Sequence, residues 1–403
     1  MASVTSFASM RASALTIMAT RSQDQHLVAQ VASSHGAQEP ILPSSDTTKG
    51  GGDGGSGCKV IPSFGWHPWF SYQLYDDSAT EPTYKPNNDD DSDEEASNAR
   101  KATHYQAVLS PSPDQDFISS LPHPIPISSF LSTTRKHLES FPRALIGEVG
   151  LDKAFRLPEK HGDPADPSSS SSSSSPPPPR DDSLTPGGRE GRLLSPYRVR
   201  MAHQQTILWA QLRLAGEVGR AVSVHGVQAH GVLYDTISAL WKGHELKVLS
   251  RRERKMVAPN AEDFDDSDDD NDNDDNDNDS NEKPSPRQKQ PLLSGKPFPP
   301  RICLHSYSGS PDMLKQWVHP SVPSQVFVSF STAVNLGSRT KLADVVRAVP
   351  DDRILVESDL HVAGGDMDAA LEDMYRLVCE VKGWDVEDGV RRIGRNYNHF
   401  IFG

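Results

Sequence analysis

Four residues that could bind a metal ion follow short apolar, β-prone runs in four separate parts of the chain. They are Glu148, His225, His305 and Asp359. Carboxylate and imidazole groups together make mixed oxygen and nitrogen sites for divalent cations. Each residue alone has an ordinary explanation, such as a carboxylate that caps the next helix or a histidine hydrogen-bonded in a core. Together they predict a divalent metal site, provided that their strands are neighbours in one sheet.

Alternating strands and helices would bring these residues together. Hydrophobic patterning predicts seven strands, at 14–18, 59–64, 144–148, 221–225, 301–305, 326–330 and 354–357. It predicts helices at 23–32, 128–140, 203–215, 231–241, 311–318, 340–348, 367–382 and 385–397. Alternating units form a parallel sheet, and a closed (β/α)8 barrel holds its chemistry at the carboxyl ends of eight strands. We therefore predict an α/β fold in which residues 1–403 form a single TIM-type barrel that lacks one strand.

Glycines flank the first of the four candidate residues. Gly147 would let the backbone pass close to a neighbouring segment, and Glu148 would end the strand. Gly150 would then turn the chain, and Asp152 would lie in the following loop. A carboxylate at the carboxyl end of a buried strand is where such a barrel places its reactive groups.

Composition indicates long insertions without a core. Residues 76–100 and 252–298 are acidic, and 157–195 contain eight consecutive serines and four consecutive prolines, so we expect all three to be disordered. Segments 76–100 and 157–195 follow predicted strands and would emerge on the catalytic face. The acidic segment 252–298 follows a predicted helix and would emerge on the opposite face, as a spacer or a docking tail for a basic partner. The two acidic blocks, Glu262–Glu282 and Asp76–Arg100, carry −13 and −7, so the net charge of −14 becomes +6 without them. Total charge therefore says little about the partner of the folded part.

Other features limit the class of protein. The three cysteines are scattered, which fits a reducing compartment rather than a disulfide framework. No apolar run approaches the roughly 18 residues of a membrane span. We expect a protein of the cytoplasm, the nucleus or both, with no membrane partner.

Six stretches of the chain form a set of motifs, namely Gly65–Pro68 (G-W-H-P), Gly147–Asp152 (G-E-V-G-L-D), Val224–His225, Leu304–Gly309 (L-H-S-Y-S-G), Val356–Asp359 (V-E-S-D) and Asn396–Phe400. In their order and contexts they resemble the motifs of the TatD family, metal-dependent deoxyribonucleases of the amidohydrolase-like barrel class. The runs S-V-H-G-V-Q-A-H-G and F-G-W-H-P-W-F resemble a fungal branch of that family. The founding member of this branch interacts with a TPR-repeat subunit of the anaphase-promoting complex.

The resemblance implies roles for the residues. Glu148 would bridge two divalent ions (Mg, Mn or Zn), His225 and His305 would complete the shell of one, and Asp359 would bind the other. Glu148 and Asp359 would thus support catalysis, in which one ion activates water and the other steadies the leaving oxygen. His67 would face the substrate phosphate. Glu357 and Asp152 would orient the ligands, although Glu357 could instead bind a buried backbone N–H.

The sequence also departs from the family pattern. The family begins with a strand that ends in H-x-H, and no H-x-H occurs in this chain. We therefore expect the missing strand to be the first one and Met1 to be an internal methionine of a longer protein. Val227 stands where the family often has a phosphate-gripping arginine, which Gln228 or His230 could replace. Leu360-His361 replaces a small residue and proline.

Three functions remain open at this point. The first is a metal-dependent hydrolase of phosphodiester bonds, a TatD-type deoxyribonuclease with DNA as substrate. The alternative is a catalytically weakened barrel that binds a TPR-containing cell-cycle scaffold. The third is an amidohydrolase-like enzyme that acts on another ester or amide, because one barrel supports many chemistries.

Overall fold

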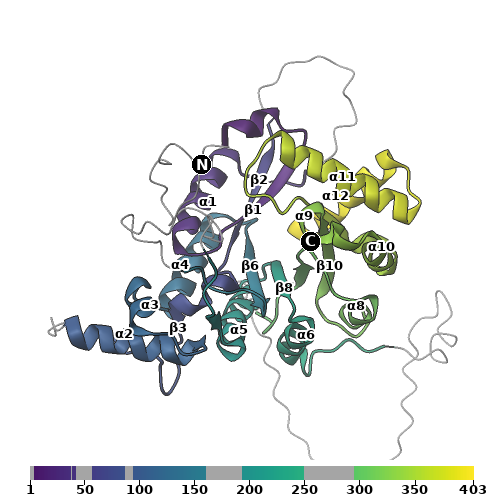
Figure 1. Cartoon of the computed structure of the whole chain (residues 1–403). Coiled ribbons are helices and arrows are strands. Elements are labelled where there is room, and N and C mark those ends of the chain that lie inside the picture. The colour runs from purple at the N-terminus through teal and green to yellow at the C-terminus, as the bar shows by residue number, and fades with distance from the viewer. Residues whose placement is uncertain (1–3, 38, 42–56, 87–93, 160–192, 249–294) are drawn as a thin grey trace, which may run out of the picture.

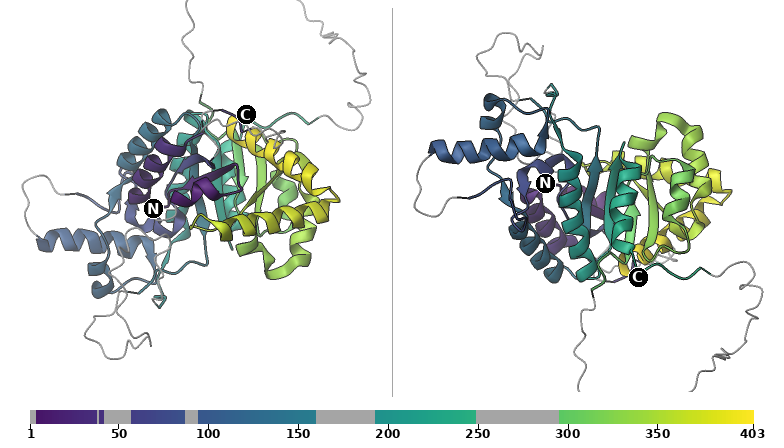
Figure 2. Two further views of the ribbon diagram at one scale, coloured as in Figure 1. Left: turned by 90° about the horizontal axis from the view of Figure 1, so that it is seen from above. Right: turned by 90° about the horizontal axis from the view of Figure 1, so that it is seen from below.

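Seven parallel strands form one curved sheet, in the order β1-β2-β6-β8-β9-β10-β11. The computed structural model describes residues 4–37, 39–41, 57–86, 94–159, 193–248 and 295–403. The strands are β1 (Ala14–Met18), β2 (Lys59–Phe64), β6 (Leu145–Asp152), β8 (Val222–Val227), β9 (Arg301–Leu304), β10 (Gln325–Ser331) and β11 (Ile354–Glu357). Neighbours in the sheet follow one another along the chain, and helices surround the sheet (Figures 1 and 2). The predicted TIM-type α/β barrel with seven strands is confirmed.

The helices that cover the outside of the sheet lie where the hydrophobic pattern predicts them. They are α1 (Ser22–His35), α4 (Ile127–Ser140), α5 (Met201–Glu217), α6 (His230–Ser238), α8 (Pro311–Trp317), α10 (Arg339–Ala348), α11 (Gly365–Lys382) and α12 (Val386–Phe402). Each buries one apolar face, as amphipathic helices in a barrel do. None of the helices in the described ranges is long and apolar enough to cross a membrane.

The prediction that β6 ends at Glu148 is wrong. The strand continues to Asp152, and Gly150 to Asp152 pair with His225 to Val227 of β8. Gly150 is needed for this pairing rather than for a turn, because a Cβ there would lie 2.0 Å from the carbonyl oxygen of His225. Asp152 therefore lies in the sheet rather than in a loop.

The barrel interior is built in layers. The layer nearest the amino ends of the strands is apolar and contains Ile61, Leu145, Ala221, Cys303, Phe327 and Leu355. Phe400 and Ile401 of α12 pack against it in the same buried cluster. Two residues further along each strand, the same face carries Ser63, Gly147, Ser223, His305, Ser329 and Glu357. A Cβ on Gly147 would lie 2.9 Å from Ser223 Cβ and 3.0 Å from Ser63 Oγ. The expected close approach at Gly147 is confirmed, and the interior becomes polar toward the carboxyl ends of the strands.

The barrel is open between β1 and β11, the first and last strands of the sheet, whose outer edges pair with no other strand in the described residues. Asp368 of α11 bridges toward β1, because its Oδ2 and Oδ1 accept the backbone N–H groups of Arg11 (2.8 Å) and Ala12 (3.2 Å). Thr16 Oγ1 of β1 lies 2.8 Å from the Tyr397 hydroxyl of α12. Side chains of the last two helices thus hold the exposed edge of β1.

An aromatic lobe beside β2 and α5 was not predicted. It includes 3-10 helix η2 (Pro68–Gln73), α2 (Glu94–Val108), α3 (Gln115–Ser120) and the short pairs β3 (Leu74–Tyr75) with β5 (Ile125–Pro126) and β4 (Leu109–Ser110) with β7 (Arg198–Val199). Its buried side chains include Trp66, Phe70, Tyr72, Tyr105, Phe117 and Phe130. In Figure 1, α2 and α3 project to one side of the barrel.

The boundaries of the three expected disordered insertions need correction. In 76–100, residues from Glu94 onward form the first half of α2, whose acidic first turn suits a helix N-terminus. In 157–195, Leu157 and Ser195 are joined, since Ser195 N–H donates to Leu157 O at 2.9 Å. In 252–298, Phe298 is buried in the main core. Residues 87–93, 160–192 and 252–294 of these predictions lie outside the described residues.

Candidate metal centre

The carboxylate of Glu148, which lies inside β6, is surrounded by three histidines from neighbouring strands. His67 follows β2, His225 lies inside β8 and His305 directly follows β9. Glu148 Oε1 is 2.8 Å from His225 Nδ1, 3.5 Å from His67 Nε2 and 3.6 Å from His305 Nε2. One donor atom from each of His67, Glu148 and His225 fits within a mutual distance of 4.8 Å. We call His67, Glu148, His225 and His305 the candidate metal centre.

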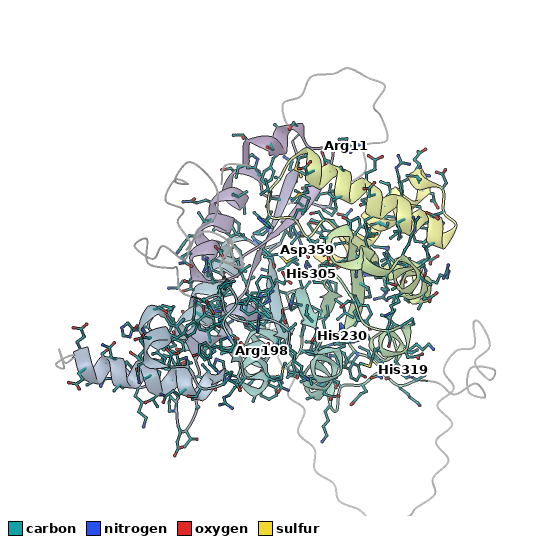
Figure 3. The ribbon with its side chains drawn as sticks, in the orientation of Figure 1. Arg11, Arg198, His230, His305, His319 and Asp359 are labelled. Atoms are coloured by element: carbon teal, nitrogen blue, oxygen red, sulfur yellow. The ribbon has the colours of Figure 1, made fainter. Side chains whose placement is uncertain are left out.

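A second group of carboxylates holds His305. Its Nδ1 lies 2.8 Å from Glu357 Oε2, and its Nε2 lies 3.3 Å from Asp359 Oδ1. Glu357 ends β11, and Asp359 follows it with a left-handed φ of 55°. Figure 3 shows Asp359 and His305 next to each other in the middle of the barrel. The four residues predicted to bind metal are therefore in contact, with Glu148 and His225 on one side and His305 and Asp359 on the other.

Asp152 holds His225 from the opposite side. Its Oδ2 is 3.2 Å from His225 Nε2 and accepts the indole N–H of Trp69 at 2.6 Å. These hydrogen bonds outweigh burial and lower the pKa of Asp152 to about 2. The expectation that Asp152 orients a ligand agrees with this contact, and the ionised carboxylate fixes the ring of His225.

The charges of these groups follow from their contacts. Burial raises the pKa of Glu148, but His305, His67 and His225 outweigh it and lower that pKa well below its ordinary value. Burial lowers the pKa of His225, yet Asp152 and Glu148 together raise it to about 9. The pKa of His305 is raised in the same way, mainly by Glu148 and Glu357. The anionic oxygens thus hold cationic rings, and a divalent cation among these donors would replace protons as the positive charge.

His67 differs from the other two histidines. Its side chain is 3% exposed, and burial lowers the pKa of His67 despite the nearby Glu148. A neutral imidazole can offer a lone pair to a metal or an N–H to an anion. Its ring lies edge-on to those of Trp69 and His225, at 4.6 and 4.5 Å between centroids. The structure therefore brings His67 into the centre itself.

Comparison with known proteins identifies the chain. Residues 54–401 match the profile of a family described as TatD related DNase. The chain belongs to the TatD family.

Two yeast proteins are similar to this TatD chain over most of its length. "Cut9-interacting protein scn1" of Schizosaccharomyces pombe is 36% identical over 390 residues, which cover 96% of this chain and 91% of that protein. "Uncharacterized deoxyribonuclease YMR262W" of Saccharomyces cerevisiae is 23% identical and covers 85% of this chain and 82% of its own. A solved structure of YJJV, a TatD homologue from Escherichia coli, covers 99% and 90% of the two chains, with 12% identity and a TM-score of 0.47.

The donor set of this TatD chain fits a divalent cation. Metal–nitrogen and metal–oxygen bonds of roughly 2.0–2.2 Å put ligand atoms about 3–4 Å apart. The distances of 3.5 and 3.6 Å from Glu148 Oε1 to His67 and His305 agree with that spacing, while the 2.8 Å to His225 is the shorter distance of a direct hydrogen bond. One carboxylate with imidazoles suits a borderline cation, and the added carboxylate of Asp359 brings oxygen for a harder one.

Sequence reasoning missed two glutamines that fix the backbone of this site. Gln204 Oε1 accepts the N–H of Asp152 (2.8 Å), while its Nε2 donates to the Asp152 carbonyl (2.9 Å). Gln211 lies two turns further along α5, on the same face of the helix. It binds the N–H and the carbonyl of Trp66 in the same way, at 2.7 and 3.1 Å. Both glutamines are buried. The seven-residue spacing, which puts them on one face of a helix, was the available signal.

A group of serines around Glu357 was also missed. Ser306 Oγ and Ser329 Oγ donate to the two oxygens of Glu357, the latter at 2.9 Å, and Ser306 Oγ lies 2.8 Å from Ser331 Oγ. These bonds, with His305, lower the pKa of Glu357 against the effect of burial. None of the described contacts of Glu357 supports the alternative in which its carboxylate accepts a hydrogen bond from a buried backbone N–H. Strand alternation could have found Ser329 and Ser331.

The two residues considered as replacements for the missing arginine lie at different places. Gln228 is exposed, with a φ of 53°. His230 begins α6, and its Nε2 lies 3.3 Å from Ser308 Oγ. His230 and His305 line one small pocket with Tyr307. Of the two, His230 is the residue that faces the site.

Proposed function

We propose that this TatD chain is a metal-dependent phosphodiesterase, with DNA as its substrate and Mg²⁺, Mn²⁺ or Zn²⁺ as its cofactor. The observation that carries the proposal is the convergence of Glu148 with His67, His225 and His305 from neighbouring strands of the sheet. Buried titratable groups that converge in one place are typical of functional sites. The family description as DNases and the similar yeast deoxyribonuclease support DNA as the substrate class.

The residues would divide the work as follows. Glu148, His225 and His305 would hold one ion, and Asp359 would bind a second ion that Glu148 shares. Bound ions supply an electrophile for the phosphate and lower the pKa of water, which provides the nucleophile. Asp152 and Glu357 keep the rings of His225 and His305 in position through the 3.2 and 2.8 Å contacts.

His67 would contact the substrate phosphate. Its Nε2 is 3.5 Å from Glu148, and its Nδ1 accepts the backbone N–H of Trp69 at 3.2 Å, which leaves the proton on Nε2. An N–H that points into the centre can donate to a phosphate oxygen without adding a full charge. The same position allows His67 to become a metal ligand once that proton leaves.

The test combines metal content with DNA hydrolysis in the wild type and in Glu148→Gln. We expect the wild type to bind divalent ions and cleave DNA, and Glu148→Gln to lose both, because the replacement removes the only anionic ligand near all three histidines among the described residues. Glu217→Gln is the matched control, since Glu217 is exposed on α5 and pairs with Arg135 on the outside. A wild type that binds metal but cleaves no DNA, while it cleaves RNA or a small ester, would replace DNA as the substrate. Full activity of Glu148→Gln would refute the site.

A second candidate function is binding to a TPR-repeat subunit of the anaphase-promoting complex, in the cytoplasm or nucleus. The observation in its favour is the relative named for its interaction with Cut9, 36% identical over nearly the whole chain. Calorimetry with a purified TPR subunit tests it. Binding that Glu148→Gln retains separates this role from hydrolysis, and no heat of binding at micromolar concentrations excludes it.

A further inference from the structure

The segment directly after β6 places a lysine at the edge of the candidate metal centre. The backbone N–H of Lys153 donates to Val227 O at the end of β8 (3.0 Å). Asp152 Oδ1 accepts the N–H groups of Ala154 (2.7 Å) and Phe155 (2.8 Å). Three hydrogen bonds thus fix this turn, while the side chain of Lys153 is exposed. The ammonium group therefore extends from a rigid base next to Asp152.

Arg198 lies over the same turn. Its Nη1 donates to the carbonyl oxygen of Lys153 at 2.9 Å. Arg198 belongs to β7, where it pairs with Ser110 of β4, so its backbone is held as well. Figure 3 shows Arg198 beside α5, on the side of His305 away from Asp359. Two cationic side chains therefore share one fixed turn at the carboxyl end of β6.

Within the described residues, neither of these two cations has an acidic partner. No carboxylate in the described parts of the chain forms an ion pair with Lys153 or Arg198, and both side chains are exposed. The nearest carboxylate in sequence, Asp152, is 5% exposed and turned inward, where it binds Trp69 and His225. Val227 and Gln228 bring no charge to the neighbouring end of β8. The pair is thus an exposed positive site that adjoins a buried centre.

We infer that Lys153 and Arg198 form a subsite for a second phosphate of a DNA strand whose neighbouring phosphodiester lies at Glu148. The inference rests on the proposed function. The two places are connected by short contacts, Glu148 to His225 to Asp152, and Lys153 is the next residue. A lysine and an arginine that converge on one anion form charge-assisted hydrogen bonds with a phosphate. A small diester has no second phosphate, so the subsite favours polynucleotides over small esters.

A binding experiment tests the subsite without metal-dependent catalysis. Fluorescence anisotropy of a labelled single-stranded DNA is measured over a range of salt concentrations, without divalent ions, for the wild type and for Lys153→Ala/Arg198→Ala. We expect the double variant to bind about tenfold more weakly and the slope of log K against log salt to fall by about 0.7, the value for one phosphate contact on a single strand. Lys242→Ala/Arg213→Ala is the matched control, because both residues are exposed on the helical outside of the barrel. An unchanged slope and affinity in the Lys153/Arg198 variant overturn the inference.

A kinetic experiment links the subsite to substrate choice. With metal supplied, the ratio of kcat/KM for the DNA strand to kcat/KM for bis(p-nitrophenyl) phosphate should fall about tenfold in the double variant. Lys153→Arg/Arg198→Lys keeps both charges and should restore most of the ratio. An equal loss for both substrates would mean that the variant damages the centre, which overturns the subsite. A wild type that binds DNA but cleaves neither substrate refutes the proposed function alone, and the loss of binding in the double variant would still support the subsite.

Discussion

Replacing Gln204 with methionine tests whether α5 positions the candidate metal centre. Gln204 is 2% exposed and makes three hydrogen bonds, to the N–H and carbonyl of Asp152 and to the carbonyl of Val199 at 3.1 Å. Methionine has a similar length and no hydrogen-bonding amide, so it removes the bonds while it fills most of the space. Asp152 is the residue that fixes His225, so its backbone position bears directly on the centre.

The expected loss of stability follows from those contacts. A typical hydrogen bond contributes about 0.5–1.5 kcal/mol, and a buried group left without a partner costs about 1–3 kcal/mol. Three bonds in a buried place therefore predict a loss of about 2–5 kcal/mol in the free energy of unfolding. Urea titration followed by circular dichroism measures it. Gln205→Met is the matched control, because the neighbouring half-buried Gln205 makes one side-chain bond, to Thr236 (2.9 Å), and should cost about 1 kcal/mol.

A second readout separates positioning from stability. In folded Gln204→Met, a displaced Asp152 should weaken divalent-ion affinity about tenfold or more, as outer hydrogen-bond partners of metal ligands do. Calorimetric titration below the unfolding midpoint measures this affinity. The reasoning is refuted if Gln204→Met and Gln205→Met lose equal stability, or if ion affinity is the same in the wild type and both variants.

Three further predictions concern other parts of the fold. Burial lowers the pKa of His104 to about 4, so stability should fall as the pH drops from about 6.5 to 4, because the unfolded state binds the proton first; His104→Gln should remove about 3 kcal/mol of this loss, measured by urea titration at pH 7 and pH 4. Asp368→Ala should destabilise the protein by about 2–4 kcal/mol and expose the edge of β1, seen as faster hydrogen exchange there, whereas Asp366→Ala, exposed in the same turn of α11, should cost under about 1 kcal/mol. Gly150→Ala should lower the melting temperature strongly or prevent folding, because its Cβ would meet the backbone of β8 at 2.0 Å, while Gly231→Ala, with open space around it, should not; equal melting temperatures would contradict the pairing of β6 with β8.

The sheet could be predicted because its strands are short apolar runs, most of them largely buried, although β1 is half-buried along its whole length. Such runs stand out in a polar chain, and the residues just after them are the ones that a parallel barrel brings together. This is why Glu148, His225 and His305 were found without a structure. The end of β6 was misjudged because glycine usually signals a turn, whereas Gly150 is required by the close approach of the His225 backbone.

The aromatic lobe could not be predicted from periodicity. Helix α2 begins at Glu94 in an acidic stretch that is typical of disorder, and its buried face includes Lys101 and His104 rather than a regular apolar stripe. Both polar groups are satisfied by distant partners, Lys101 Nζ by Ser119 O (3.1 Å) and His104 Nε2 by Tyr72 O (2.8 Å). Such partners come from tertiary structure, and local sequence carries no sign of them.

The opening of the barrel affects the two sides of the candidate centre differently. Glu148, His225 and His305 belong to β6, β8 and the end of β9, and each of these strands pairs with a neighbour on both sides. Asp359 is exposed and follows β11, which is an edge strand of the sheet. Its Oδ1 lies 3.3 Å from His305 Nε2. The side built around Glu148 is therefore held by the sheet itself, while the position of Asp359 depends on the loop before α11. A single ion should thus bind first at Glu148, and any ion at Asp359 should bind more weakly, because an ordering cost must be met there.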